Sequence, residues 1–153
     1  MKQLNPEWCE WIVPFINSSP FFSFMNIKLN EFRYGESFLE LEIQNNHKQL
    51  HGVAHGGVLA ALIDAAGTLA AVTRIEGDYS ATTIEMKINY LSSAKKGKIL
   101  AHGHCLKLGK TIGVSEATIT DEEKKIIAHG IVTVMIRAPI LFQGTDKIPT
   151  KFV

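Results

Sequence analysis

One carboxylate stands out because the residues around it are almost all apolar. Asp64 lies in the run from Val58 to Val72, where Ala, Leu, Ile and Val dominate. Burying an unpaired carboxylate costs several kcal/mol, so a protein that keeps one in such surroundings usually has a use for it. Asp64 is therefore a candidate general base or nucleophile. The alternative is a solvated position on an amphipathic helix, which the apolar neighbours disfavour.

A second chemical feature directly precedes this run. His55, Gly56 and Gly57 form a turn at the expected start of a helix. Glycine lets a ligand approach the backbone closely, and the first N–H groups of a helix have no partner within it. Such N–H groups can donate to an oxygen that becomes negative during a reaction, and the helix dipole supports this. The N–H of Gly57 is therefore a candidate oxyanion donor.

The spacing of these two features suggests that one chain does not build the site alone. Asp64 follows Gly57 by seven residues, which is two helical turns or roughly 10 Å along the axis. Both lie on a face of small residues, together with Ala60, Ala61, Thr68 and Ala71. Because the two groups are too far apart to act on one carbonyl, two antiparallel copies of this face would have to combine them. The sequence thus predicts a homodimer with shared sites.

The scaffold for these residues can be predicted from hydrophobic periodicity. We expect a long helix over Val58–Val72, with Val58, Leu59, Leu62, Ile63 and Leu69 on its buried side. A short amphipathic helix is expected over Glu7–Ile16. Alternating or β-branched runs predict strands at 37–43, 82–91, 98–106, 111–120 and 126–136. Short turns join the last four, which predicts an antiparallel meander wrapped around one apolar helix, an α+β fold.

Composition narrows the class of protein. The 153 residues are enough for one domain over 1–153, with the N-terminal helix and the tail Pro139–Val153 at its periphery. A net charge of +1 argues against a nucleic-acid-binding protein. The longest apolar run is shorter than the roughly 20 residues of a membrane span, so no membrane association is expected. Two distant cysteines and no signal-peptide pattern predict a cytoplasmic protein.

Three segments resemble the hotdog-fold acyl-CoA thioesterases, specifically the phenylacetate-pathway thioesterase branch. Gln49–Gly67 matches the His-Gly-Gly loop, helix and helix acid of that branch, Thr83–Gly97 resembles a strand with the turn that follows it, and Leu106–Thr111 resembles the next turn. The resemblance covers about residues 20–136. It implies a hotdog fold, in which an antiparallel sheet wraps one long central helix, and hydrolysis of an acyl-CoA thioester. Coenzyme A would be part of the substrate, and neither a cofactor nor a metal is implied. A homodimer, and by pairing of dimers a homotetramer, would be the assembly.

The resemblance also implies roles for individual residues. Asp64 matches the acid that acts as nucleophile or as general base for water. Gly57 matches the backbone N–H that polarises the thioester carbonyl. Gln49 takes the place of an Asn or Gln that orients the carbonyl or the water, and His55 takes that of a histidine that shapes the loop and contacts the leaving group.

Further residues match substrate-binding positions of the family. Thr68 and Thr83 lie where hydroxyl groups hold the water or thioester, and Tyr90 ends the motif strand. Lys110 lies in a turn that can meet coenzyme A phosphates. Two positions depart from the family pattern, since Ser93 replaces a common proline and Lys110 replaces a common arginine; the lysine keeps the charge but not bidentate pairing. Other lysines near these turns would add positive charge or simply be solvated: Lys95, Lys96 and Lys98.

Other interpretations stay open at this stage. A non-catalytic acyl-CoA-binding or sensing protein could use the same fold, although it could dispense with Asp64. A hotdog hydratase or dehydratase pairs a histidine with an acid in a different loop signature. His102 and His104 share a strand face but lack a third metal ligand. Aromatic residues gathered before the first strand are expected in the core or a dimer interface, and some could line an acyl pocket: Trp8, Trp11, Phe15, Phe21, Phe22 and Phe24.

Overall fold

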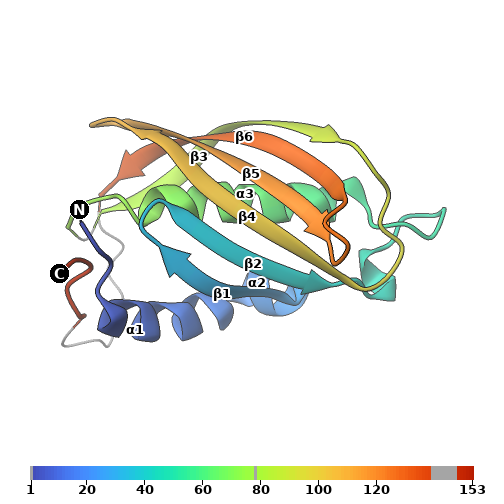
Figure 1. Ribbon diagram of the computed structural model, residues 1–153, viewed down its shortest axis with the longest axis horizontal. Coiled ribbons are helices and arrows are strands. Elements are labelled where there is room, and N and C mark those ends of the chain that lie inside the picture. The colour runs from blue at the N-terminus through green and yellow to red at the C-terminus, as the bar shows by residue number, and fades with distance from the viewer. Residues whose placement is uncertain (1, 78, 139–147) are drawn as a thin grey trace.

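The computed structural model describes residues 2–77, 79–138 and 148–153. In this part of the chain an antiparallel sheet of six strands curves around one long helix, α3 (Gly56–Val72) (Figure 1). The other elements are α1 (Pro6–Asn17), α2 (Pro20–Met25), β1 (Ile27–Arg33), β2 (Glu36–Glu42), the short 3-10 helix η1 (Asn45–His47), β3 (Ser80–Tyr90), β4 (Lys98–Leu108), β5 (Ile112–Asp121) and β6 (Ile126–Arg137). The expected α+β hotdog architecture is confirmed.

The strand order corrects one expectation. The sheet runs β1-β2-β4-β5-β6-β3, so β4, β5 and β6 form a meander while β3 pairs with β6 and not with β4. The segment between β3 and β4 is a crossover and not a hairpin turn. The N–H groups of Leu91 and Ser92 donate to the Ile127 carbonyl, and the Ala94 carbonyl accepts from Ala54 N–H. These hydrogen bonds fix the connection as it crosses the end of the sheet and passes the start of α3.

Helix α3 begins two residues earlier than the apolar pattern predicts. The His55 side chain caps the helix, because its Nδ1 accepts the Gly57 N–H at 2.8 Å. Side-chain burial also differs from the expected faces, since Ala71 is fully buried and Leu69 is only half-buried. Small residues bring the helix close to the sheet, and a Cβ on Gly103 of β4 would lie 2.1 Å from the Ala66 carbonyl oxygen. The central strands can approach α3 this closely only without side chains there.

The N-terminal helix and the end of the chain pack together. Helix α1 forms as expected and is capped by Asn5, whose Oδ1 accepts Glu7 N–H at 3.1 Å. Residues 148–153 of the peripheral tail are held against the N-terminal segment and α3, and residues 139–147 lie outside the described residues. Phe152 forms an isolated antiparallel β-bridge with Leu4. The Lys151 ammonium donates to the Val72 and Ile75 carbonyls at the end of α3.

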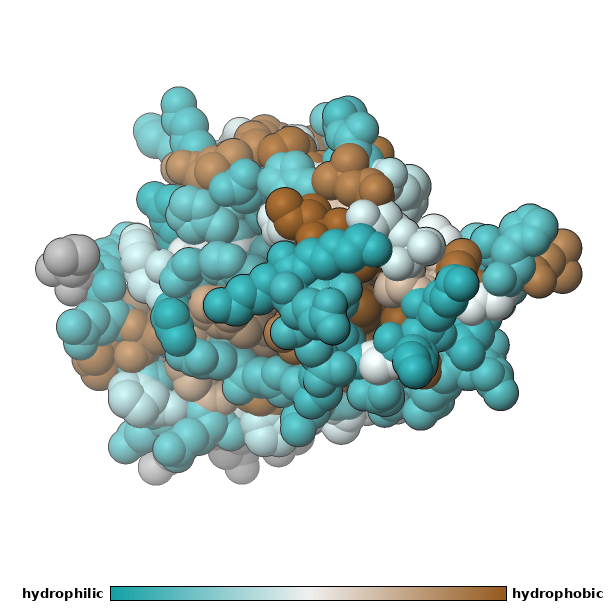
Figure 2. Space-filling view, turned by 45° about the vertical axis from the view of Figure 1, so that its right-hand side comes forward, coloured by the Kyte–Doolittle hydropathy of each residue, from teal (hydrophilic) through white to brown (hydrophobic). Residues whose placement is uncertain are grey.

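The outer face of the sheet is mainly polar, as expected for an antiparallel sheet with one solvated face. Figure 2 shows hydrophilic side chains over most of this side, with scattered hydrophobic ones between them. His102 pairs with Glu36 at 2.9 Å and His104 lies 3.5 Å from Glu116.

Within the described residues, no three His, Cys, Asp or Glu side chains are grouped to hold a metal ion. No helix in those residues is long and apolar enough to cross a membrane.

Candidate active site

The side chain of Asp64 meets two threonines on the half-buried side of α3. Thr83 of β3 donates from its Oγ1 to Asp64 Oδ1 at 2.6 Å. Thr68, one turn further along α3, lies 2.8 Å from Thr83 and 3.4 Å from Asp64, oxygen to oxygen. The structure therefore brings together three of the residues that the sequence singled out. Thr83 could reach Asp64 only because β3 packs alongside the helix.

The hydrogen-bond directions in this cluster follow from counting hydrogens. A threonine hydroxyl has one hydrogen, so Thr83, which donates to Asp64, must accept from Thr68. Thr68 is closer to Thr83 than to Asp64, which makes a relay from Thr68 through Thr83 to Asp64. Within the described residues both contacts to the carboxylate fall on Oδ1. Oδ2 is therefore available to a water molecule or a substrate.

The start of α3 forms the second part of the site. The Gly57 N–H, the candidate oxyanion donor, is bonded to His55 Nδ1. The Tyr90 ring lies against Gly56, with its Cζ 3.4 Å from where a Cβ would stand. A groove of about 370 Å³ opens beside this turn, lined by Ala54, Gly56, Leu59, Tyr90, Leu91, Ser92 and Ser93. Tyr90 and Gly56 thus lie at one opening, and Gly57 is the next residue along α3.

Gln49 lies in the loop before α3. Its Oε1 accepts the His51 N–H, and the intervening Leu50 is fully exposed. Sequence reasoning missed His47, which is buried and holds this loop through hydrogen bonds of its side chain and backbone. Its Nδ1 accepts Gln44 N–H at 3.1 Å and its carbonyl accepts His55 N–H at 2.8 Å. No sequence signal separated His47 from the polar run around it, because its burial depends on the fold.

The lysines do not gather at one place in the protomer. Lys95 and Lys96 follow Ala94 in the crossover beside the start of α3. Lys110 is exposed in the turn between β4 and β5, at the opposite end of the sheet (Figure 1). Lys98 pairs with Glu40 at 3.2 Å. Within one chain, then, Lys110 is remote from the helix start.

The aromatic residues before the first strand divide into two groups. Trp8, Trp11 and Phe15 of α1 line a cavity that also reaches Thr68. Phe21 and Phe24 of α2 are exposed. Three of these aromatic residues, all from α1, thus line a cavity, and its use as an acyl pocket stays a prediction.

Comparison with known proteins agrees with the resemblance seen in the sequence. A family model described as the thioesterase superfamily matches residues 51–128, about half of the chain. Human acyl-coenzyme A thioesterase 13 is 33% identical over 98 residues, which cover 63% of this chain and 69% of that protein. A structure from Streptococcus mutans bound to acetyl CoA is 28% identical with a TM-score of 0.70, covering 76% of this chain and 92% of that one. The Escherichia coli PaaI protein of the phenylacetic acid degradation operon has a TM-score of 0.80 at 18% identity, covering 89% and 97%, which shows the shared fold.

Proposed function

The chain belongs to the thioesterase superfamily, and from this premise we propose that it hydrolyses an acyl-CoA thioester to the free acid and coenzyme A. The observation that carries the proposal is the Asp64 carboxylate, which a threonine relay holds on the accessible side of an otherwise apolar helix. A thioester carbonyl is already electrophilic, so a carboxylate with an oxyanion donor can suffice for its hydrolysis.

In the proposed reaction, Asp64 accepts a proton from a water molecule whose oxygen attacks the carbonyl carbon. The carbonyl oxygen then carries the negative charge of a tetrahedral intermediate. Collapse of the intermediate breaks the carbon–sulfur bond, and the coenzyme A sulfur leaves with the proton that Asp64 took up. In the alternative route, Asp64 attacks the carbonyl carbon directly, the carbon–sulfur bond breaks and coenzyme A leaves as its thiolate, so that an acyl–Asp64 anhydride forms; water then cleaves the anhydride to the free acid and the Asp64 carboxylate, and the proton released protonates the thiolate. Thr83 and Thr68 orient the carboxylate in both routes.

The oxyanion donor in this proposal is the Gly57 N–H. Because His55 Nδ1 accepts that N–H at 2.8 Å, the carbonyl oxygen of the substrate has to displace the imidazole. The exchange replaces one hydrogen bond by another, and the new bond strengthens as charge develops on the oxygen. His55 is therefore a positioning residue that keeps the helix start formed while no substrate is bound.

We further infer that a homodimer assembles the site. Gly57 and Asp64 are two turns apart in one protomer, about 10 Å, so they cannot serve the same carbonyl. β3 is an edge strand that pairs only with β6 in the described chain, and an unpaired edge is a template for another strand. Ile84, Tyr90 and Leu91 are exposed along or beside it. Antiparallel pairing of β3 with its copy would bring Asp64 of the partner subunit towards Gly57.

This dimer also offers an explanation for the distribution of lysines. Pairing β3 with its own copy in opposite directions would bring one protomer's β4–β5 turn towards the other protomer's crossover. Lys110 of the partner subunit would then approach Lys95 and Lys96. The combined charge suits the phosphates of coenzyme A, with lysines acting as point charges.

Thiol release from acyl-CoA substrates tests the proposed function. Purified wild type and Asp64→Asn are compared with Glu123→Gln as the control, because Glu123 is an exposed carboxylate in the β5–β6 turn. We expect Asp64→Asn to retain its far-UV circular dichroism and melting curve but to lose nearly all thiol release, while Glu123→Gln keeps wild-type turnover. Normal turnover by folded Asp64→Asn would overturn the assignment. Tight acyl-CoA binding without thiol release by wild type would favour the sensing alternative.

A further inference from the structure

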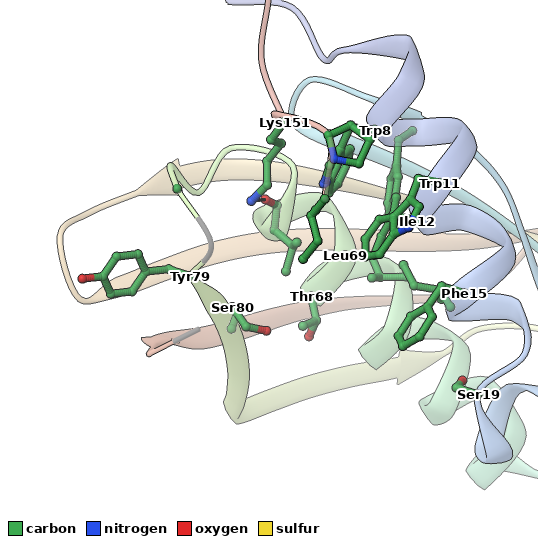
Figure 3. Close-up of a pocket in the computed structure, with 17 residues that line it drawn as sticks. Trp8, Trp11, Ile12, Phe15, Ser19, Thr68, Leu69, Tyr79, Ser80 and Lys151 are labelled. Atoms are coloured by element: carbon green, nitrogen blue, oxygen red, sulfur yellow. Dashed lines mark hydrogen bonds between the residues drawn. The ribbon is translucent and has the colours of Figure 1, made fainter. Parts of the chain in front are cut away.

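A cavity of about 320 Å³ lies between α1, the second half of α3 and the start of β3. Its walls are largely aromatic and aliphatic, and they include Trp8, Trp11, Phe15, Phe32, Leu69 and Val72. Figure 3 shows Trp11 and Phe15 projecting from α1 towards Leu69 of α3. A concave, mainly apolar space with few polar groups is the usual form of a small-molecule site.

The cavity continues from the Asp64 cluster. Thr68 belongs both to the relay that reaches Asp64 through Thr83 and to the cavity wall. Ser80 adds a second hydroxyl to the lining, whereas Leu69 and Val72 carry the wall onward along α3. A ligand with its reacting carbonyl at Asp64 therefore has an apolar space directly beyond Thr68.

A charged group lies at the opposite end of the cavity. Lys151 lines the cavity, and its ammonium donates to the Val72 and Ile75 carbonyls at the end of α3. The ammonium also lies 5.5 Å from the Trp8 ring centre. An alkyl chain that extended this far would have to displace bonded polar groups, which opposes longer chains.

Two independent dimensions give the same ligand size. A volume of 320 Å³ accommodates about ten non-hydrogen atoms, if each takes roughly the 30 Å³ of a liquid water molecule. From Asp64 to Val72 the helix rises about 12 Å. An extended alkyl chain advances roughly 1.3 Å per carbon, given a carbon–carbon bond of about 1.5 Å, so about nine carbons span that distance.

We propose that this cavity is the acyl pocket and that the enzyme selects apolar acyl groups of medium length, represented by octanoyl- and decanoyl-CoA. The inference rests on the proposed thioesterase function and adds its substrate class. The aromatic wall comes from α1, which lies before the matched family segment of residues 51–128. The pocket therefore depends on α1 as well as on α3 and the start of β3.

The wall is preformed, which favours selection by size. Trp8 stacks on Phe32 with ring centres 5.7 Å apart, and Trp11 stacks on Phe15 at 5.8 Å. Ordered side chains lose little conformational freedom when a ligand enters. Burying one more methylene should raise kcat/KM about fourfold until the cavity is full. Beyond decanoyl the value should stop rising or fall.

The first test is a series of straight-chain substrates from butyryl- to palmitoyl-CoA, followed by thiol release. We expect kcat/KM to rise with each added methylene and to reach its maximum at octanoyl or decanoyl. Val72→Phe, which fills the inner end, should move the maximum to a shorter chain. Trp11→Ala should move it to a longer one, and Phe24→Ala, at an exposed residue outside the cavity, should leave it unchanged. Thermal melts confirm that each variant is folded.

A second readout does not depend on turnover. Trp8 and Trp11 are the two tryptophans of the chain and both line the cavity, so an occupant should change the intrinsic fluorescence. S-alkyl-CoA thioethers lack the carbonyl and cannot be hydrolysed. We expect saturable quenching by S-octyl-CoA and little by S-ethyl-CoA at the same concentration.

The two readouts separate the failure of each proposal. Quenching that depends on chain length, without any thiol release, would uphold the pocket and overturn the thioesterase function. Thiol release with a flat chain-length profile would uphold the function and overturn the pocket, as would folded Val72→Phe and Trp11→Ala variants that both keep the wild-type profile.

Discussion

Replacing Thr83 by valine should slow thioester hydrolysis about thirtyfold while leaving the protein folded. Valine has nearly the shape of threonine but cannot donate a hydrogen bond. The change removes the 2.6 Å contact to Asp64 Oδ1 and the acceptor for Thr68 at 2.8 Å. A hydrogen bond to a charged group contributes about 2 kcal/mol, and tenfold in rate corresponds to about 1.36 kcal/mol.

Two further substitutions make this prediction specific to the relay. Thr68→Val removes a hydroxyl that lies 3.4 Å from the carboxylate and acts mainly through Thr83. A bond between neutral groups contributes about 1 kcal/mol, so the expected loss is about fivefold. Thr83→Ser keeps the hydroxyl and should stay within a few-fold of wild type. The expected order of activity is therefore Thr83→Ser, then Thr68→Val, then Thr83→Val.

The measurement is steady-state thiol release with octanoyl-CoA, with kcat and KM determined separately. Because Thr83 orients the base and, unlike Thr68, does not line the cavity, the loss in Thr83→Val should appear mainly in kcat. Circular dichroism melts establish that the variants are folded. The reasoning is refuted if folded Thr83→Val keeps wild-type kcat, or if Thr83→Ser is as slow as Thr83→Val.

Four other perturbations test separate features. His55→Ala removes the cap of α3, so the free energy of unfolding in urea should fall by about 1 kcal/mol, while kcat should fall less than about tenfold. A loss of kcat as large as that of Asp64→Asn would instead make His55 catalytic. Ile84→Asp places a charge on the exposed edge of β3, so light scattering should show a monomer, and its thiol release should be low. A dimer of unchanged mass would contradict the edge pairing. Gly103→Ala puts a Cβ within 2.1 Å of the Ala66 carbonyl oxygen and should cost about 3 kcal/mol of unfolding free energy, whereas wild-type stability would contradict the close helix–sheet contact. The hydrogen bond from Asn30 and the pairing with Lys98 lower the pKa of Glu40, so the folded state favours the ionised form. Glu40→Gln should therefore be less stable than wild type at neutral pH by under about 1 kcal/mol. Urea titrations should show this difference shrink as the pH falls below the ordinary glutamate pKa of about 4.3 and vanish once the pH has passed through the lowered pKa of Glu40.

Several elements could be predicted because their signals are local. The helix containing Asp64 and most strands follow from the spacing of apolar and β-branched residues, which reflects the geometry of each element. The His-Gly-Gly turn marked the start of α3 to within two residues. The predicted helix started two residues late because the apolar pattern begins at Val58, whereas the His55 cap sets the observed start of α3. Caps depend on one side-chain contact that periodicity does not record.

The arrangement of the strands could not be read from the same signals. Short segments between strands predicted a meander, yet the Leu91–Gly97 connection crosses the sheet end and leaves β3 beside β6. Strand order depends on which hydrophobic faces cover α3, a property of all strands together. The sequence could therefore nominate Thr83 by resemblance, but only the packing of β3 against α3 shows its contact with Asp64.

The sequence by itself determined the chemical groups and their local spacing: one carboxylate in an apolar helix, two turns after a pair of glycines. The physical reason is that helical geometry converts residue number directly into distance and direction. The tertiary structure alone decided that Thr68 and Thr83 form a relay to that carboxylate, and that Trp8 and Trp11 wall the space beyond it. Those contacts join segments far apart in the chain, and long-range packing brings them together.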